Sequence, residues 1–141
     1  MNSHKPVILL VEDDENDVFF MRRALNKAEI DFSIQIVVNG QDALDYLGGA
    51  RKFGDRALYP LPSLVFLDLK LPFVGGLDVL EWIRSQPSLK ELPIVVLTSS
   101  AEGRDRQKAA ELGVKAYFVK PPTPEMVREA MQFAKELVSA Q

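Results

Sequence analysis

Short apolar runs alternate with amphipathic stretches about five times along the chain. The first run, Val7–Val11, has no polar member, as expected for a parallel strand that helices cover on both faces. Leu64–Leu67, Ile94–Leu97 and Ala116–Val119 are similarly apolar. Phe32–Val38 instead alternates apolar and polar side chains, which favours a strand at the edge of the sheet. This alternation of strands and helices predicts an α/β fold with a parallel sheet.

Segments with the 3.6-residue period of helices lie between these strands. Asn39 is placed to cap the second helix, and Pro87 and Gly113 are placed to end the third and the fourth. Thr123 is placed to cap the last helix, with Pro124 at its first position. The expected helices are residues 16–28, 41–47, 77–85, 102–112 and a segment that starts at residue 124.

Two parts of the chain need a choice between interpretations. Residues 48–63 show no clear period, and we expect a surface excursion there rather than a partner contact. The last helix carries two apolar rows, and we assign the first to the core. The second row should then leave apolar area exposed, which often marks an interface. The first row is Met126, Ala130, Phe133 and Leu137, and the second is Val127, Met131, Ala134 and Val138.

Polar side chains follow four of the apolar runs at the point where each strand is expected to end. Glu12 and Asp13 follow the first run, Asp68 the third, Thr98 the fourth and Lys120 the fifth. The carboxyl ends of parallel strands form the ligand crevice of an open sheet, so we expect these groups to converge.

Such a group suits a divalent cation and a phosphoryl group. Clustered carboxylates favour a hard cation such as Mg²⁺, and a lysine ammonium is a compact partner for a phosphate oxygen. Asp68 follows Leu-Val-Phe-Leu, where a carboxylate is costly unless paired or metal-bound, so it is the main candidate for a phosphoryl acceptor. An ion pair with Lys120 is the alternative explanation for Asp68. Asp14, Glu15 and Asp17 are expected to be solvated residues of a helix start.

Composition narrows the classes of protein further. The 141-residue chain has a net charge of −3, no cysteine and one histidine, His4. A histidine triad, a multi-histidine metal site and thiolate chemistry are therefore excluded, and nothing indicates direct nucleic-acid binding. No run approaches the length of a membrane span, and the N-terminus has no signal-peptide pattern. We expect one cytoplasmic domain over residues 1–141, without an output domain.

In their order and spacing, these residues resemble the receiver domain of two-component response regulators, with a CheY-like layout over about residues 5–137. The matching features are the pair Glu12–Asp13, Asp68 with Gly76 eight residues later, Thr98, and Lys120–Pro121. Each feature is common alone, but the ordered set is highly specific. The resemblance implies a flavodoxin-like, doubly wound sheet of five parallel strands in the order 2-1-3-4-5.

The resemblance also implies roles for the residues at the strand ends. Asp68 is the implied acceptor of a phosphoryl group from a phosphohistidine, and Lys120 is its cationic partner. The implied cofactor is Mg²⁺ or Mn²⁺. Asp13 matches a direct ligand of the cation and Glu12 a ligand through water, while Asp68 and the backbone carbonyl of Lys70 complete the protein ligands.

Further residues match the family's switch. The Thr98 hydroxyl is expected to donate to a phosphoryl oxygen, and the ring of Tyr117 would pack inward as the threonine moves. A half-buried strand aromatic is the alternative explanation for Tyr117. Pro121 is a candidate for a cis peptide bond that aims the preceding lysine. Lys70 and Ser100 flank the site and bear on the lifetime of the phosphoryl group.

The implied partners are a sensor histidine kinase or a histidine phosphotransfer protein, and a downstream protein. Two features, the stretch 48–63 and the expected lack of an output domain, make the chain similar to small response regulators paired with cyanobacterial phytochromes. Output is expected through the fourth helix, fifth strand and fifth helix, a face that could also form a homodimer. The protein would promote its own phosphorylation and dephosphorylation without being a metabolic enzyme. A phosphorelay intermediate is the related alternative.

Two other classes share parts of this pattern. A phosphatase like those of the haloacid-dehalogenase superfamily would also use Asp68, but it needs a second acid two residues later, where this chain has Lys70. A nucleotide- or flavin-binding module would need a glycine-rich loop after the first strand, where this chain has Glu12 and Asp13.

Overall fold

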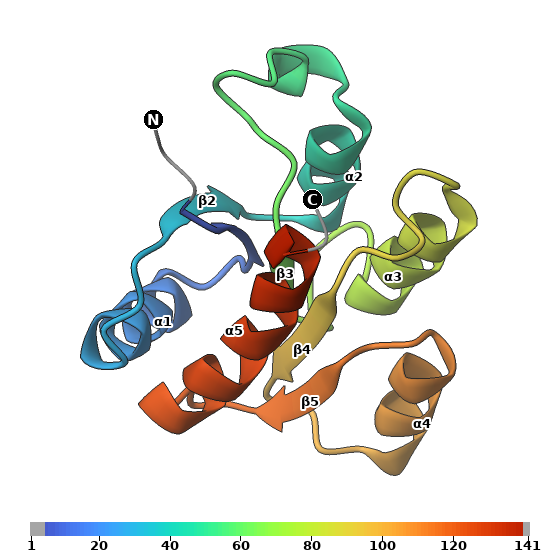
Figure 1. Cartoon of the computed structure of the whole chain (residues 1–141). Helices are drawn as coiled ribbons and strands as arrows, with labels where there is room; N and C mark the ends of the chain where they lie inside the picture. Colours follow the sequence, from blue (N-terminus) through green and yellow to red (C-terminus); the bar gives the residue numbers. More distant parts are fainter. Residues whose placement is uncertain (1–4, 140–141) are drawn as a thin grey trace.

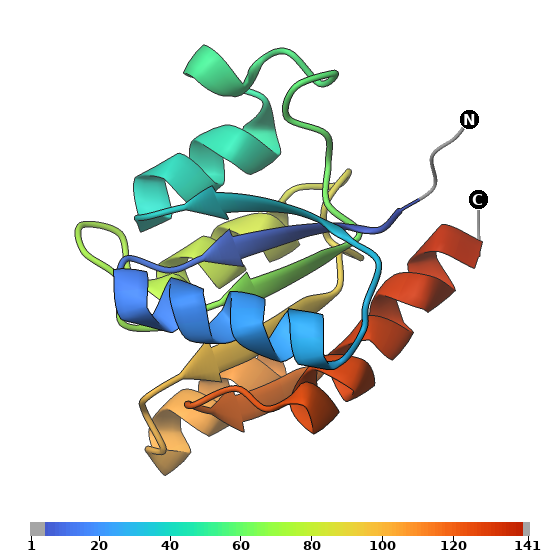
Figure 2. The same cartoon turned by 90° about the vertical axis from the view of Figure 1, so that its left-hand side faces the viewer.

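The computed structural model describes residues 5–139, with side chains described as far as residue 134. Five parallel strands alternate with helices along this part of the chain (Figure 1). The strands lie in the order β2-β1-β3-β4-β5, and their arrows all point the same way in Figure 2. This arrangement confirms the predicted sheet. The strands are β1 (Val7–Val11), β2 (Ser33–Val37), β3 (Leu64–Leu67), β4 (Ile94–Thr98) and β5 (Ala116–Val119).

The helices begin and end near the capping residues that the sequence indicates. The Asn39 side chain accepts the Asp42 backbone N–H at 2.7 Å, and the Thr123 hydroxyl accepts the Met126 N–H at 3.1 Å. Gly113, with a φ of 77°, follows the fourth helix. No helix within residues 5–139 is long and apolar enough to cross a membrane. The helices are α1 (Glu15–Lys27), α2 (Gly40–Gly48), α3 (Gly76–Ser85), α4 (Gly103–Glu111) and α5 (Pro124–Ser139).

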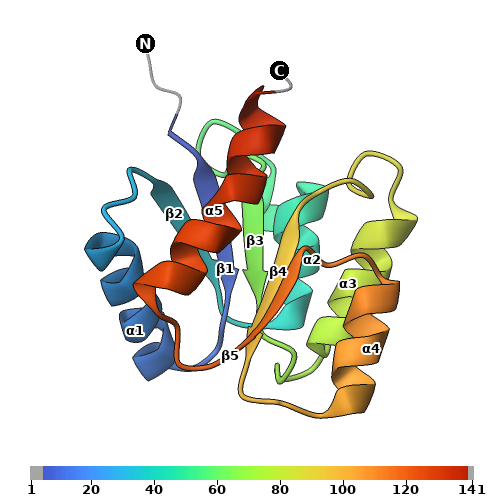
Figure 3. The same cartoon turned by 60° about the horizontal axis from the view of Figure 1, so that its bottom comes forward.

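The helices cover both faces of the sheet and create two cores. Helices α1 and α5 lie on one face, and α2, α3 and α4 lie on the other (Figure 3). Successive strand residues point to opposite faces, so Ile8 and Leu10 pack on the α1 side while Leu9 and Val11 pack on the α2 side. Because both faces are covered, the first strand has no place for a polar side chain.

The excursion between α2 and β3 packs back on α2. It contains a short 3₁₀ helix, η1 (Arg51–Phe53), and the buried Phe53 ring contacts Tyr46 and Tyr59 at centroid distances of 5.2 and 5.0 Å. Arg56 donates to the carbonyl oxygens of Tyr46 and Tyr59 at 2.8 and 3.0 Å. The segment is a surface excursion as expected, and the aromatic cluster is a feature that the sequence pattern did not reveal.

The inward face of α5 differs from the sequence prediction. Val127, Met131 and Ala134, from the row expected outside, are at most 8% exposed and lie in the core together with Ala130 of the first row. Met126 and Phe133, assigned to the core, are only partly buried. The two rows lie about 100° apart around the helix, and the packing of α5 on the sheet decides which one turns inward. The side chains of Leu137 and Val138 lie outside the described residues.

Candidate functional site

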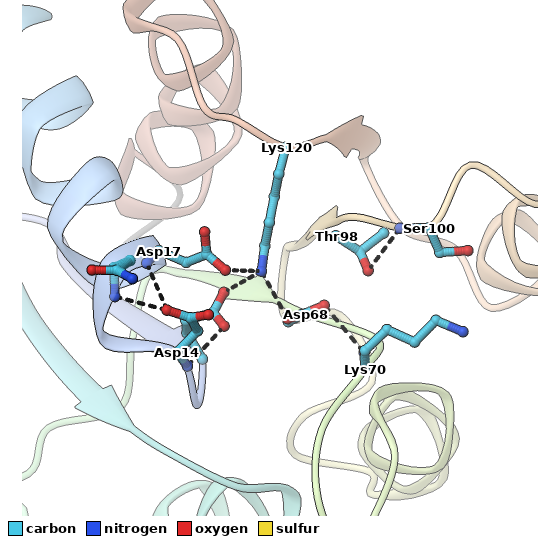
Figure 4. Close-up of polar contacts among 9 residues, drawn as sticks. Asp14, Asp17, Asp68, Lys70, Thr98, Ser100 and Lys120 are labelled. Carbon is cyan, nitrogen blue, oxygen red and sulfur yellow. Dashed lines mark hydrogen bonds and ion pairs between the residues drawn. The ribbon is translucent and has the colours of Figure 1, made fainter.

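The carboxyl ends of three strands bring opposite charges together in one crevice (Figure 4). Glu12 follows β1, Asp68 follows β3 and Lys120 follows β5; Figure 4 labels Asp68 and Lys120. The Lys120 Nζ atom lies 2.7 Å from Glu12 Oε1 and 2.9 Å from Asp68 Oδ2. The side chains of Glu12, Asp68 and Lys120 are only 3%, 5% and 11% exposed, so these ion pairs are poorly screened by water. The structure therefore contains the ion pair that was the alternative explanation for Asp68.

Three carboxylates in this crevice lie close enough together to share one cation. Within the described residues, oxygens of Glu12, Asp13 and Asp68 lie within 4.8 Å of one another. Asp13 is exposed and the other two are buried, so the cluster is reached from solvent on the Asp13 side. Carboxylate oxygens are hard donors of the kind that Mg²⁺ and Mn²⁺ prefer. The residues present therefore fit such a cation.

Asp17 lies in the site, although the sequence interpretation placed it in solvent. Its Oδ2 atom lies 2.8 Å from Lys120 Nζ, and its side chain is 27% exposed. Its neighbour Asp14 instead caps α1 and accepts the backbone N–H groups of Asn16 and Asp17 at 2.8 and 3.4 Å. The sequence offered one hint, the position of Asp17 one helical turn after Asp13. That spacing does not show which strand end the first turn of α1 faces.

Burial and the neighbouring charges raise the pKa of two groups in this site, for different reasons. Burial raises the pKa of Glu12 to about 7, although the hydrogen bond from Lys120 opposes this rise. Burial alone would lower the pKa of Lys120, but hydrogen bonds to Asp17, Glu12 and Asp68 outweigh it and raise the pKa above its ordinary value. Lys120 is therefore a permanent cation, whereas Glu12 titrates near neutral pH.

Glu12 is expected to make the metal-free protein less stable as the pH rises. Its folded-state pKa of about 7 lies above its ordinary value of 4.5, so the folded protein binds this proton more tightly. The free energy of unfolding should therefore fall by about 3 kcal/mol at most as the pH rises from 4.5 to about 7. It should stay at this lower value at higher pH.

Denaturant titrations in EDTA at about pH 5 and about pH 8 measure this effect. Glu12→Gln should lose this part of the pH dependence. Glu15→Gln, which removes an exposed acid from the next helical turn, should keep it. The assignment to Glu12 is wrong if Glu12→Gln and the wild type show the same pH dependence.

The end of β4 connects the crevice to α4 through hydrogen bonds. The Thr98 side chain is fully buried, and its Oγ1 atom accepts the Ser100 N–H at 3.4 Å. Ser100 Oγ donates to Asp105 Oδ2 at 2.7 Å, and the Tyr117 hydroxyl donates to the Ser100 carbonyl oxygen at 2.9 Å. The Arg106 guanidinium lies 4.6 Å from the centroid of the Tyr117 ring. The half-buried Tyr117 is thus tied to the loop that follows Thr98, and its role as a switch stays a prediction.

The backbone near Asp68 is closely packed. The Lys70 N–H donates to Asp68 Oδ1 at 3.1 Å, and the Lys70 ammonium lies 3.8 Å from Asp105 Oδ2. A Cβ atom at Gly76 would collide with the Asp68 carbonyl oxygen, so the start of α3 needs a glycine there. The Lys120–Pro121 peptide bond is cis. Coordination by the Lys70 carbonyl stays a prediction.

Comparison with known families decides between the classes that share these residues. A model of the response regulator receiver domain matches residues 8–132. The chain belongs to the response regulator receiver family. Among the proteins that the chain resembles, the probable methanogenesis regulatory protein FilR2 of Methanothrix harundinacea is 35% identical over 134 residues, which cover 92% of this chain and 81% of FilR2. Response regulator Rcp1 of Synechocystis is 38% identical over 114 residues, which cover 81% of this chain and 76% of Rcp1.

Solved structures of receiver domains share the fold and include regulators named for phytochromes. The bacteriophytochrome response regulator RtBRR is 40% identical with a TM-score of 0.82, and the match covers 93% of this chain and 78% of RtBRR. The phosphorylated cyanobacterial phytochrome response regulator RcpA is 28% identical with a TM-score of 0.77, over 97% of this chain and 91% of RcpA. The Mn(2+)-bound form of Rcp1 is 32% identical with a TM-score of 0.75, over 95% of this chain and 90% of Rcp1. The similarity to small phytochrome-associated regulators is confirmed.

Proposed function

We propose that this receiver domain accepts a phosphoryl group on Asp68 from a phosphohistidine of a sensor histidine kinase or a histidine phosphotransfer protein. The observation that carries the proposal is the buried Asp68 carboxylate with the Lys120 ammonium 2.9 Å away. In the transfer, one Asp68 oxygen forms a bond to phosphorus while the phosphorus–nitrogen bond breaks, and the imidazole keeps the electron pair of that bond. The product is a mixed anhydride on Asp68.

Lys120 and Thr98 are proposed to bind the transferred phosphoryl group. The Lys120 ammonium already contacts the acceptor carboxylate, so it lies where the negative charge of the phosphoryl oxygens arrives. The Thr98 hydroxyl, buried at the end of the neighbouring strand, is the second proposed donor. Donors that are fixed in advance need little rearrangement when the charge arrives.

Glu12, Asp13, Asp68 and the Lys70 backbone carbonyl are the proposed ligands of Mg²⁺ or Mn²⁺. The support is the carboxylate cluster, whose oxygens lie within 4.8 Å of one another, and the related Rcp1, which has a Mn(2+)-bound form. A bound cation supplies positive charge that offsets repulsion between these carboxylates and the incoming phosphoryl group. The absence of cysteine suits the cytoplasmic setting that we propose.

Incubation with acetyl phosphate and Mg²⁺, followed by measurement of the intact mass, tests the proposed function. One added phosphoryl group that maps to Asp68 supports it. Continuous hydrolysis of acetyl phosphate without any phosphorylated protein would favour the phosphatase alternative instead. Transfer from phosphorylated Asp68 to a histidine phosphotransfer protein would assign the protein to a phosphorelay.

Asp13→Asn is expected to weaken Mg²⁺ binding at least about tenfold, because it removes one charged oxygen ligand. Asp14→Asn is the matched control, since it removes the neighbouring charge while asparagine still caps the helix. Calorimetric titration with MgCl₂ measures both affinities. Equal losses in the two variants would mean that the acidic run is assigned in the wrong register.

We propose that output occurs through the face formed by α4, β5 and α5. A groove on this face is lined by Arg106, Ala110, Val114 and Tyr117, among others. The Tyr117 hydroxyl contacts the Ser100 carbonyl, so a movement of that loop would change the groove. The apolar row of α5 around Met131 gives no support, because it lies in the core.

Ala110→Glu is expected to keep the protein monomeric in the presence of beryllofluoride, which stands in for the phosphoryl group. The wild type should form a homodimer under the same condition, because a charge in the groove opposes burial of this face. Light scattering measures the mass, and Ala57→Glu, on the excursion before β3, is the control. A wild type that stays monomeric throughout would remove the homodimer and leave a different partner protein.

A further inference from the structure

The Lys120 ammonium is fully used by three carboxylates. A lysine ammonium has three N–H donors, and Lys120 directs them at Glu12 Oε1, Asp17 Oδ2 and Asp68 Oδ2, at 2.7, 2.8 and 2.9 Å. The close-up shows the Lys120 side chain descending between Asp17 and Asp68, so the ammonium lies between these two carboxylates (Figure 4). Asp17 belongs to α1, whereas Asp68 follows β3, so the ammonium is held from two separate elements.

Two of the three carboxylates, Glu12 and Asp68, also belong to the cluster that is proposed to bind the cation. Glu12 Oε2 accepts the Asp14 N–H at 3.1 Å, and Asp68 Oδ1 accepts the Lys70 N–H at 3.1 Å. Each oxygen of the two carboxylates therefore already has one donor, and a cation or a phosphoryl group at these oxygens would weaken or replace the contact with Lys120. Within residues 5–139, Asp17 is not a member of the cluster that could hold a cation.

We propose that Asp17 is a positioning residue that keeps the Lys120 ammonium at Asp68 while Glu12 and Asp68 exchange partners. This inference rests on the proposed phosphorylation of Asp68. When Asp68 becomes a mixed anhydride, it loses its charge, and the ammonium is free to donate to a phosphoryl oxygen. Asp17 takes no part in the transfer and keeps its hydrogen bond, so Lys120 turns about a fixed partner and does not leave the crevice.

Two other roles for Asp17 predict different results. An acid in the first turn of a helix stabilises it through the helix dipole, and this role would affect folding but not the rate of phosphorylation. A purely electrostatic role would slow the reaction, because a carboxylate repels the incoming phosphoryl group. Removal of the charge would then speed the reaction, whether or not a hydrogen-bond acceptor remains.

The experiment compares Asp17→Ala, which removes the acceptor, with Asp17→Asn, which removes only the charge. Glu15→Ala and Glu15→Gln are the matched controls, because Glu15 is an exposed acid in the same helical turn. We expect Asp17→Ala to lower the rate of phosphorylation by acetyl phosphate and Mg²⁺ at least about tenfold. Asp17→Asn should restore the rate to within about threefold of the wild type, because its amide oxygen still accepts from Lys120.

The Lys120 ammonium supplies a second readout that does not depend on phosphorylation. In protein labelled with ¹⁵N, its N–H protons should exchange slowly with water, because each one is held by a carboxylate. Asp17→Ala should speed this exchange, and Asp17→Asn should leave it close to that of the wild type. The Lys120→Met variant identifies the signal by its loss.

The two readouts separate failure of this inference from failure of the proposed function. A wild type that acetyl phosphate does not modify would contradict the proposed function, while the exchange rates would still test the contact between Asp17 and Lys120. If Asp17→Ala matches Glu15→Ala in both readouts, Asp17 is a helix-start residue only. If Asp17→Ala and Asp17→Asn both react faster than the wild type, Asp17 acts through its charge and the positioning role is wrong.

Discussion

Asp68→Asn is expected to abolish phosphorylation by acetyl phosphate. Asparagine has nearly the same shape as aspartate, but its amide is not a nucleophile that can attack phosphorus. Asp68 is 4% exposed, and its carboxylate is held by the Lys70 N–H and the Lys120 ammonium, so no other acid of the cluster occupies the same place. Intact mass measured over time should show one added phosphoryl group on the wild type and none on the variant.

Removal of the metal is expected to have the same effect as this substitution. In EDTA, an incoming phosphoryl dianion meets the three carboxylates of Glu12, Asp13 and Asp68, and each like-charge pair at contact costs roughly 4 kcal/mol near a protein surface. Lys120 offsets only part of this repulsion, because its ammonium also forms an ion pair with Asp17. Asp14→Asn should react like the wild type with Mg²⁺ present. Phosphate retained by Asp68→Asn, or added to the wild type in EDTA, would overturn the assignment.

Lys120→Met is expected to destabilise the metal-free protein by about 3–5 kcal/mol above neutral pH, the usual loss when one partner of a buried ion pair is removed. Without the ammonium, Glu12 and Asp68 face each other as buried acids with no cation between them. Asp17, at 27% exposure, is partly solvated and adds less to this cost. Denaturant titration in EDTA at about pH 8 measures the change.

Mg²⁺ and pH should each reverse part of this loss. A divalent cation bound by the carboxylate cluster replaces some of the missing positive charge, so Mg²⁺ should raise the free energy of unfolding more in Lys120→Met than in the wild type. Lower pH should also help, because protonation of Glu12 removes one of the repelling charges. Lys90→Met, which replaces an exposed lysine, is the control. A Lys120→Met variant as stable as Lys90→Met in EDTA would show that the carboxylates do not need the ammonium.

The fold and most of the crevice could be predicted from the sequence because they depend on local patterns. An apolar run such as Val7–Val11 is long enough only for a strand, and its lack of polar members requires helices on both faces. In a parallel sheet every such run ends at the same edge. Glu12, Asp68 and Lys120 therefore lie close together, regardless of the conformation of the loops between the strands.

The tertiary structure alone decided how neighbouring elements face one another. The period of α5 shows two apolar rows, but only packing against the sheet turns Val127 and Met131 inward in place of Met126 and Phe133. A helix rotated by one residue has the same periodicity, so the pattern cannot distinguish the two orientations.

The same reason explains why Asp17 was misplaced. An acidic helix start looks alike in the sequence whether it faces water or a lysine from the far end of the chain. Asp17 and Lys120 are 103 residues apart, and the docking of α1 beside the crevice brings them within 2.8 Å. The sequence by itself determined which charged groups gather at the edge of the sheet. The packing of the helices determined which of them touch.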